Sequence, residues 1–298
     1  MTPGRSPSRP PAVAGSFYPD DPRRLARMID ELLEAATAVP KPAGLDPLTI
    51  LGAVVPHAGL VYSGLIAALA WRLVGENRPE TIVLAGTDHQ GAAGSGIGVW
   101  IGGDWQTPLG NVPTDPDVAQ LIAALGPPFA ADNNAHLFGE HSLEVQLPIL
   151  LRVFPEARIV PLAVSPRLLT HNEAGRRLGR LLKNLRTDGL PDRRLILVAS
   201  SDFAHYPPAE VCEEADDRLI EPLLKLDADG LALLEATLLR ARLPGLLCGL
   251  CGIDPVRVTL AALTEMGATR GILLGKATSA DAGGDPGRTV GYASAVFA

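Results

Sequence analysis

Apolar residues follow two alternating patterns along the chain, and together these patterns predict a fold. Short runs rich in β-branched residues predict buried strands at residues 49–55, 81–85, 97–101, 158–164, 194–199, 271–274 and 290–297. Between many of these runs, apolar residues recur at the spacing of a helix, over residues 63–74, 118–125, 173–185, 213–224, 231–240 and 255–266. The alternation predicts an α/β fold with a central, mostly parallel or mixed sheet flanked by helices.

The domain organisation is predicted to be simple. Residues 12–298 contain no internal repeat and no long linker, so we expect one α/β domain there. Residues 1–11, MTPGRSPSRPP, are basic and rich in proline but lack the apolar stretch of a signal peptide. We expect them to form a disordered leader.

Composition narrows the class of protein. The chain has 298 residues, of which 47% are hydrophobic, and a net charge of -7 without clustered Lys or Arg. Binding to nucleic acid is therefore not expected. No apolar run approaches the roughly 20 residues that span a bilayer, so no membrane association is expected. Three cysteines are too few for a secreted disulfide framework, and we expect a cytoplasmic protein.

Three histidines come shortly after the ends of predicted strands. His57 follows the strand at 49–55, His89 follows the strand at 81–85, and Asp202 and His205 follow the strand at 194–199. Ligands of open α/β sheets bind beyond the carboxyl ends of the strands, so we predict one shared polar site. A single histidine is more often a packing or capping residue, and Asp202 could instead cap a helix that starts near Phe203.

The chemistry of these side chains fits a transition metal. Imidazole is the commonest metal ligand, and a carboxylate or thiolate completes many sites. Cys248 and Cys251 form a Cys-Gly-Leu-Cys sequence, which is compatible with a redox pair, half of a zinc site or two buried thiols. For Cys251 we expect plain burial. The chain contains no GxGxxG, P-loop, GxSxG or HExxH motif, which argues against nucleotide binding, serine hydrolysis and zincin chemistry.

A further polar cluster precedes an apolar helical pattern. Glu140 and His141 come directly before a helix that we expect to begin near Ser142, and Glu144 lies one turn further on. One interpretation is a helix cap. The other is substrate binding or proton transfer at the rim of the histidine site.

Seven motifs in fixed order resemble the Memo family, whose prokaryotic members are often called AmmeMemoRadiSam system protein B. They are AGSFYP (14–19), PHAGLVYSG (56–64), GTDHQG (86–91), TPLGNVPTD (107–115), EHSLEVQLP (140–148), SSDFAHY (200–206) and LCG (247–249). The resemblance implies a fold similar to the class III extradiol dioxygenases. One departure is Thr87-Asp88 before His89, where the family usually has Pro-Asn.

The resemblance also implies roles for individual residues. It implies a metal site of His57, His89 and Cys248, with Fe(II) the most expected ion and Cu or Zn as alternatives. Asp202, His205, Glu140 and His141 would act around the metal as supporting or acid–base groups.

Two functions from different classes remain open. The first is a metal-dependent redox enzyme, and the second is a non-catalytic module that binds a peptide or protein in the same pocket; a metal hydrolase is a weaker third. The ligand would be an unknown small molecule or peptide. Family association further suggests radical-SAM and AMMECR-like partner proteins.

Overall fold

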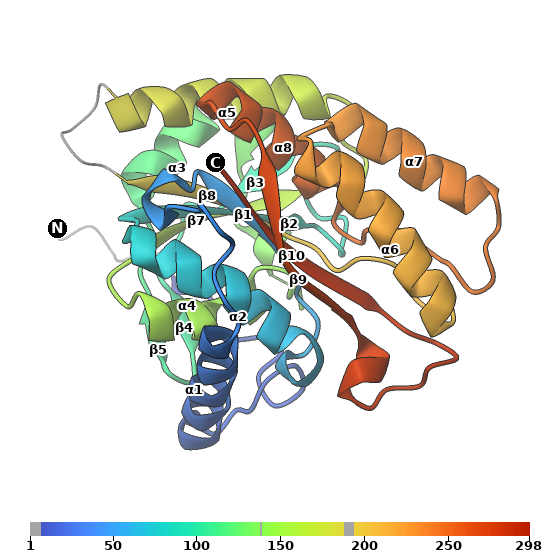
Figure 1. Ribbon diagram of the computed structural model, residues 1–298. Helices are drawn as coiled ribbons and strands as arrows, with labels where there is room; N and C mark the ends of the chain where they lie inside the picture. Colours follow the sequence, from blue (N-terminus) through green and yellow to red (C-terminus); the bar gives the residue numbers. More distant parts are fainter. Residues whose placement is uncertain (1–6, 138, 188–193) are drawn as a thin grey trace, which may run out of the picture.

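A mixed eight-stranded sheet organises the computed structural model, which describes residues 7–137, 139–187 and 194–298 (Figure 1). The strand order is β6-β3-β7-β2-β8-β1-β10-β9. The strands are β1 (Gly52–Val55), β2 (Thr81–Thr87), β3 (Ile97–Val99), β6 (Phe129–Ala131), β7 (Arg158–Val164), β8 (Leu195–Ser200), β9 (Gly271–Thr278) and β10 (Gly291–Phe297). A separate hairpin contains β4 (Trp105–Thr107) and β5 (Gly110–Val112).

The four central strands, β7, β2, β8 and β1, run parallel to one another, whereas β3 and β10 join them antiparallel. The predicted α/β class with a mixed sheet is therefore confirmed. The parallel arrangement has a direct consequence for function, because the carboxyl ends of β2, β8 and β1 meet at one edge of the sheet.

Helices cover both faces of the sheet (Figure 1). One face carries α1 (Pro22–Ala38), α2 (Leu60–Asn77) and α4 (Leu147–Val153). The other carries α3 (Pro116–Ala123), α5 (His171–Thr187), α6 (Ala209–Leu224), α7 (Ala228–Arg240) and α8 (Ile253–Met266). Short 3-10 helices are η1 (Pro47–Thr49), η2 (Asn134–His136), η3 (Glu144–Gln146) and η4 (Ser279–Ala282).

Burial on both faces explains the continuous apolar runs of the strands. In β1, Val54 packs into the core beneath α5 and α8, whereas Ala53 and Val55 pack into the core beneath α1 and α2. All three side chains are fully buried. The sequence of such a strand therefore lacks the alternation of a half-exposed strand.

Helices α5 and α8 approach each other unusually closely at two glycines. A Cβ atom built on Gly175 or Gly179 would lie 2.4 Å from a backbone carbonyl oxygen of α8, that of Val258 or Ala262 respectively. Only glycine leaves room for this contact. The contact fixes α8, which begins two residues after Cys251.

The N-terminal expectation differs from the structure. Residues 7–11 pack onto the domain, and Arg9 is only 2% exposed and forms an ion pair with the buried Glu144. The expected disordered leader over 1–11 is thus wrong for this part, because a buried guanidinium requires a fixed partner. Residues 1–6 lie outside the described residues.

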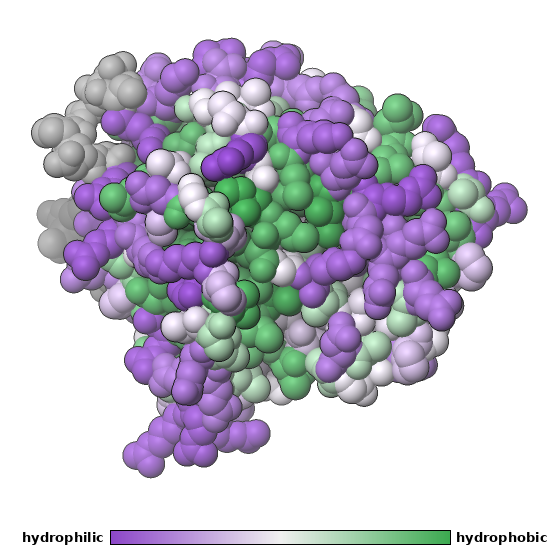
Figure 2. Space-filling model, viewed as in Figure 1, coloured by the Kyte–Doolittle hydropathy of each residue, from purple (hydrophilic) through white to green (hydrophobic). Residues whose placement is uncertain are grey.

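The surface is polar over most of the helices, as Figure 2 shows for one side of the molecule. Apolar side chains gather near the middle of this side, around β9, whose residues 271–275 are half-buried. In the described part of the chain, every helix is too short or too polar to cross a membrane.

Candidate functional site

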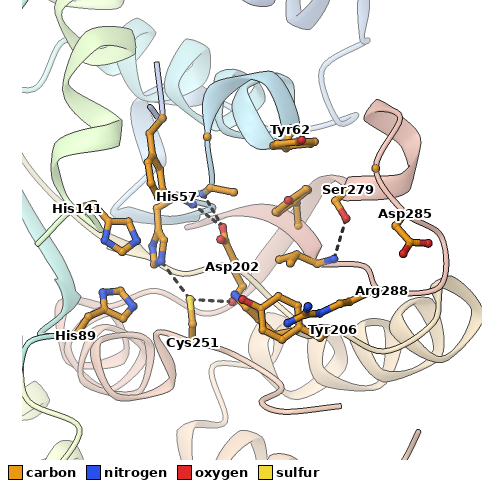
Figure 3. A pocket seen from close by; sticks show the side chains of 17 residues that line it. His57, Tyr62, His89, His141, Asp202, Tyr206, Cys251, Ser279, Asp285 and Arg288 are labelled. Atoms are coloured by element: carbon orange, nitrogen blue, oxygen red, sulfur yellow. Dashed lines mark hydrogen bonds between the residues drawn. The ribbon is translucent and has the colours of Figure 1, made fainter. Parts of the chain in front are cut away.

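Side chains from three neighbouring parallel strands converge on one pocket. His57 lies beyond the end of β1, His89 beyond β2, and Asp202 and His205 beyond β8. The pocket has a volume of about 600 Å³ and is also lined by His141 (Figure 3). The structure therefore brings together the polar residues that the strand ends predicted, and no helix begins at Phe203 for Asp202 to cap.

The hydrogen bonds of His57 determine which ring nitrogen faces the pocket. The hydroxyl of Ser200 donates to the carbonyl of Ser142 at 2.6 Å, so its oxygen is left to accept. His57 Nδ1 lies 3.1 Å from that oxygen and must be the donor. His57 Nε2 is consequently unprotonated when the ring is neutral, which is the form that binds a metal.

Glu140 gives His89 the same tautomer. Its carboxylate accepts from the His89 ring Nδ1 at 3.1 Å and from the His89 backbone N–H at 2.7 Å. It also accepts from the backbone N–H groups of His141 and Ser142, both at 2.8 Å. A carboxylate that orients a histidine in this way is typical of metal centres, where it fixes the ring and leaves Nε2 free.

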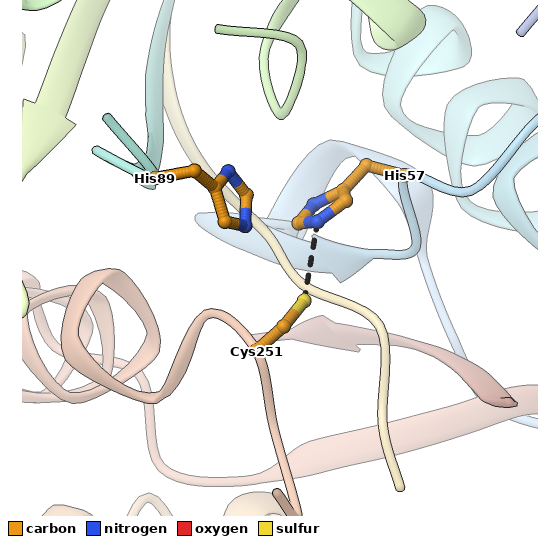
Figure 4. A group of neighbouring side chains, drawn as sticks. All are labelled: His57, His89 and Cys251. Atoms are coloured by element: carbon orange, nitrogen blue, oxygen red, sulfur yellow. Dashed lines mark hydrogen bonds between the residues drawn. The ribbon is translucent and has the colours of Figure 1, made fainter. Parts of the chain in front are cut away.

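The cysteine beside these histidines is Cys251, which corrects the prediction that Cys248 completes the site. Cys251 Sγ lies 3.1 Å from His57 Nε2 (Figure 4). The next residue, Gly252, lets this part of the chain pass close to the end of β8. A Cβ atom on residue 252 would lie only 2.7 Å from the carbonyl oxygen of Ser200. The Cys251 thiol is desolvated by burial, as expected, but it also contacts His57.

Cys248 is held elsewhere by its backbone. Its carbonyl accepts from the His205 backbone N–H at 3.0 Å, in an isolated bridge between the two residues. Three residues later the chain has turned into the start of α8, and the Cys251 thiol faces the pocket. Within the described residues, Cys248 belongs to none of the groups of potential ligand atoms that lie within 4.8 Å of one another.

Asp202 and His205 form a second pair in the pocket. One carboxylate oxygen of Asp202 accepts from the backbone N–H groups of His57 at 2.6 Å and Ala58 at 3.1 Å. His205 Nδ1 donates to the carbonyl of Phe203 at 2.7 Å, so its Nε2 is free as well. Asp202 and His205 lie with Cys251 in one group of potential ligand atoms.

His141 forms the wall of the site between the other rings. It stacks on His89 with ring centroids 4.7 Å apart and meets His57 edge to face at 5.6 Å. Phe17 packs against its other side at 4.8 Å. Phe17 belongs to the N-terminal segment, which is held because Glu144 accepts from the backbone N–H groups of Ala12 and Val13.

Burial sets the charge state of the centre. Desolvation, followed by the neighbouring His89 and His141, lowers the pKa of His57 well below its usual range. Desolvation and then the charge of Asp202 raise the pKa of the Cys251 thiol. Burial would also raise the pKa of Glu140, but hydrogen bonds from His89 and backbone N–H groups outweigh it and lower that pKa to about 2. The site thus contains the neutral imidazole of His57 and the ionised carboxylate of Glu140.

The geometry fits a transition metal. Ligand atoms of His57, His89 and Cys251 all lie within 4.8 Å of one another. Metal–nitrogen bonds of about 2.0 Å and metal–sulfur bonds of about 2.3 Å put the ligand atoms of a tetrahedral site roughly 3.5 Å apart. Small side-chain adjustments would therefore suffice to enclose an ion. Imidazole and thiolate select Fe, Cu or Zn over Mg and Ca.

Several pocket residues escaped the sequence reasoning. Cys251 could have been found, because it too precedes a glycine and it alone stands directly before the predicted helix at 255–266. Aromatic residues and one arginine from distant segments complete the lining, namely Phe17, Tyr62, Tyr206, Tyr292 and Arg288. Phe17, Tyr62 and Tyr206 fall within the motifs that resemble the Memo family, whereas no local pattern marks Arg288 and Tyr292.

Comparison with known proteins supports a family relationship over the whole described fold. The family model described as Memo-like protein matches residues 9–296. MEMO1 family proteins of Methanopyrus kandleri and Ignicoccus hospitalis are each 36% identical to the chain, over 294 and 296 residues respectively. Each alignment covers 97% of this chain and 98% of the relative.

A solved structure shares the fold. The crystal structure of uncharacterized protein JW3007 from Escherichia coli K12 superimposes with a TM-score of 0.51 at 18% sequence identity. The match covers 84% of this chain and 100% of that chain. At this low identity the likeness concerns the arrangement of strands and helices alone.

Proposed function

The chain belongs to the Memo family, and from this premise we propose that it is a metal-dependent oxidoreductase acting on a small molecule. His57 Nε2, His89 Nε2 and Cys251 Sγ would hold the ion. One observation carries the proposal: Ser200 and Glu140 each occupy the Nδ1 of one histidine, so that both unprotonated Nε2 atoms are left for an ion beside a thiol.

The ligand set supports a redox role. Two imidazoles and a thiolate differ from the two-histidine, one-carboxylate set of many iron oxygenases, and soft sulfur stabilises Fe(II) and Cu. Such an ion would supply one-electron transfer when bound. The cytoplasmic location and the radical-SAM and AMMECR-like partners stay predictions.

Protein groups around the ion can hold and move protons. Asp202 and His205 lie within 4.8 Å of Cys251 through their potential ligand atoms, and both line the pocket. Burial raises the pKa of Asp202, which makes its carboxylate a better proton acceptor. The free Nε2 of His205 can receive a proton or return it to a substrate. His141 and Phe17 exclude water from the inner wall.

Metal content after anaerobic purification and reconstitution with Fe(II), Cu or Zn tests the proposal. We expect about one ion per chain in the wild type, as for a site with three protein ligands. His57→Ala and Cys251→Ser should lose most of it, because each removes a ligand atom. Cys248→Ser is the matched control and should retain the wild-type content.

Two results would contradict the proposal. Loss of metal in Cys248→Ser but not in Cys251→Ser would reverse the assignment of the cysteine. Absence of metal from the reconstituted wild type would favour the alternative, a non-catalytic module that binds its partner in the same pocket.

A further inference from the structure

The outer end of the pocket contains an arginine without an acidic partner. Arg288 lines the pocket on the side away from His89 and His141, with Asp202 between them (Figure 3). Among the residues that the structure describes, no acidic side chain forms an ion pair with Arg288. The neighbouring Asp285 instead accepts from the backbone N–H of Gly287 at 2.8 Å, within its own turn.

Arg288 is held in place by an aromatic ring and by the backbone. Its guanidinium carbon lies 4.2 Å from the centroid of the Tyr206 ring. The residue next to it, Thr289, accepts from the Tyr206 backbone N–H and donates its own N–H to the carbonyl of Pro207 at 2.9 Å. Stacking uses the face of the guanidinium, so the N–H groups at its edge stay available for a planar acceptor.

The Tyr206 backbone is strained in a way that fits a binding role. Its φ of 71° lies in the left-handed region, which a bulky residue adopts only when surrounding contacts enforce it. Tyr206 lines the pocket, and the residue is 36% exposed. Tyr62 faces the same space and is 43% exposed. The mouth therefore offers apolar faces beside one cation.

From this geometry we propose that Arg288 and Tyr206 form a carboxylate-binding subsite, and that the ligand of the pocket is a small organic acid with an apolar body. The inference deepens the proposed function. It rests on that function only in assigning the reacting end of the ligand, which is the end beside His57 and Cys251. A cavity of about 600 Å³ suits a small molecule. Arg288 would bind the acid group through two parallel hydrogen bonds.

A carboxylate fits better than a phosphate. Asp202 and Asp285 also line the pocket, and the chain carries a net charge of -7. A dianionic phosphate would meet this negative field with one arginine as its partner, whereas a singly charged carboxylate is matched by that one arginine.

The test measures binding to the metal-free protein, so that an acid cannot bind through an ion. Hexanoate and phenylacetate are titrated against their primary amides, hexanamide and phenylacetamide, with phenyl phosphate as a third anion. In the wild type we expect at least one acid to bind about tenfold more tightly than its amide, as for a hydrogen bond between charged groups. Phenyl phosphate should bind more weakly than phenylacetate.

The variants assign the preference to one residue. Arg288→Gln should abolish the preference for the acid while leaving amide binding unchanged, and Arg288→Lys should keep part of it. Arg270→Gln removes the same charge from an exposed position outside the pocket and should have no effect. Because every titration uses metal-free protein, failure of the metal proposal is distinguishable from failure of this one.

Three outcomes would overturn the subsite. These are equal binding of every acid and its amide by the wild type, an unchanged preference in a folded Arg288→Gln protein, and tighter binding of phenyl phosphate than of phenylacetate.

Discussion

Glu140 would support the proposed metal centre through its hydrogen bonds to His89. Its carboxylate holds both the ring and the backbone of His89 and also closes the turn at His141 and Ser142. The position of one ligand atom therefore depends on a residue 51 positions away in the sequence.

We predict that Glu140→Gln weakens metal affinity without preventing folding. Glutamine keeps an oxygen acceptor for the backbone N–H groups but loses the negative charge that fixes the His89 ring. Losses of this kind typically reduce metal affinity about 10–100-fold. Competition with a metal-binding dye measures the change, and Glu173→Gln, at an exposed position on α5, is the control. Wild-type affinity in Glu140→Gln would show that His89 is oriented by other contacts.

Residue types explain which parts of the site were predictable. His57 and His89 come within four residues of the end of an apolar run, so their places near strand ends can be read from the sequence. The choice between Cys248 and Cys251 could not be made from the Cys-Gly pair alone, because the pair occurs twice within five residues. Only the turn into α8 decides which thiol faces His57.

At the scale of elements, the contact between α5 and α8 carries the Cys251 side of the pocket. The two helices touch through Gly175 and Gly179, one turn apart on α5. The last turn of chain before α8 contains Cys251. A substitution on α5 that separates these helices would therefore move Cys251, although Cys251 lies more than 70 residues further along the chain.

Gly179→Ala is expected to destabilise the protein although alanine favours helices. The helix propensity gain is about 1 kcal/mol, but the new Cβ would lie 2.4 Å from the carbonyl oxygen of Ala262, which is backbone and cannot rotate away. We expect a net loss of about 1–3 kcal/mol, the usual cost of overpacking. Urea unfolding measures it.

Arg176→Ala, at an exposed position on the same helix, is the control and should change stability by less than about 0.5 kcal/mol. A Gly179→Ala protein at least as stable as the wild type would mean that the two helices can separate at little cost.

Elements with long apolar runs were predicted well, whereas short or strongly polar elements were not. β4, β5 and β6 have three residues each, too few to show a periodic pattern. α1 is rich in charged residues and buries little besides Leu25 and Ile29. Its start was nevertheless marked, because Asp21 caps the helix and Pro22 occupies its first position.

At the scale of the whole molecule, a buried carboxyl joins α6 to the loop that follows β8. Asp216 is 2% exposed and accepts from the Ala204 backbone N–H at 2.9 Å, with the Cys212 thiol nearby at 3.8 Å. Burial raises its pKa to about 7, against the opposing effects of the Ala204 hydrogen bond and the charge of Lys276. Asp217 adds a smaller effect in the same direction as burial.

The raised pKa predicts that stability falls as the pH rises. An unfolded aspartate has a pKa of about 3.9, so between pH 5 and 7 the folded state holds a proton that the unfolded state has lost. Folding is then favoured by low pH, and the contribution disappears as pH passes the folded pKa. The loss between pH 5 and 7 should be about 2–3 kcal/mol.

The side chain introduced by Asp216→Asn cannot titrate, so this variant should lack the part of the pH-dependent loss of stability that comes from Asp216. Urea unfolding of the wild type and of Asp216→Asn at pH 5 and pH 8 isolates the contribution of Asp216, because the other titrating groups contribute equally in the two proteins. Parallel pH profiles for the two proteins would rule out Asp216 as the source.

Contacts between distant segments were beyond sequence reasoning. Arg9 pairs with Glu144 across 135 positions, and this pair anchors the segment that delivers Phe17 to the pocket. A basic, proline-rich stretch has the composition of a disordered leader when read alone. The partner that orders it can be known only once the fold is known.

The pairing of β1 with β10 determines when the pocket can be assembled during synthesis. The two strands lie about 240 residues apart in the chain, and contacts of such long sequence separation form late. A ribosome adding about 5–20 residues per second needs roughly 10–50 s to pass from one to the other. Tyr292 of β10 lines the pocket, so the histidines after β1 and β2 are made well before the wall that encloses them. The pocket is therefore completed only after β10 has been made.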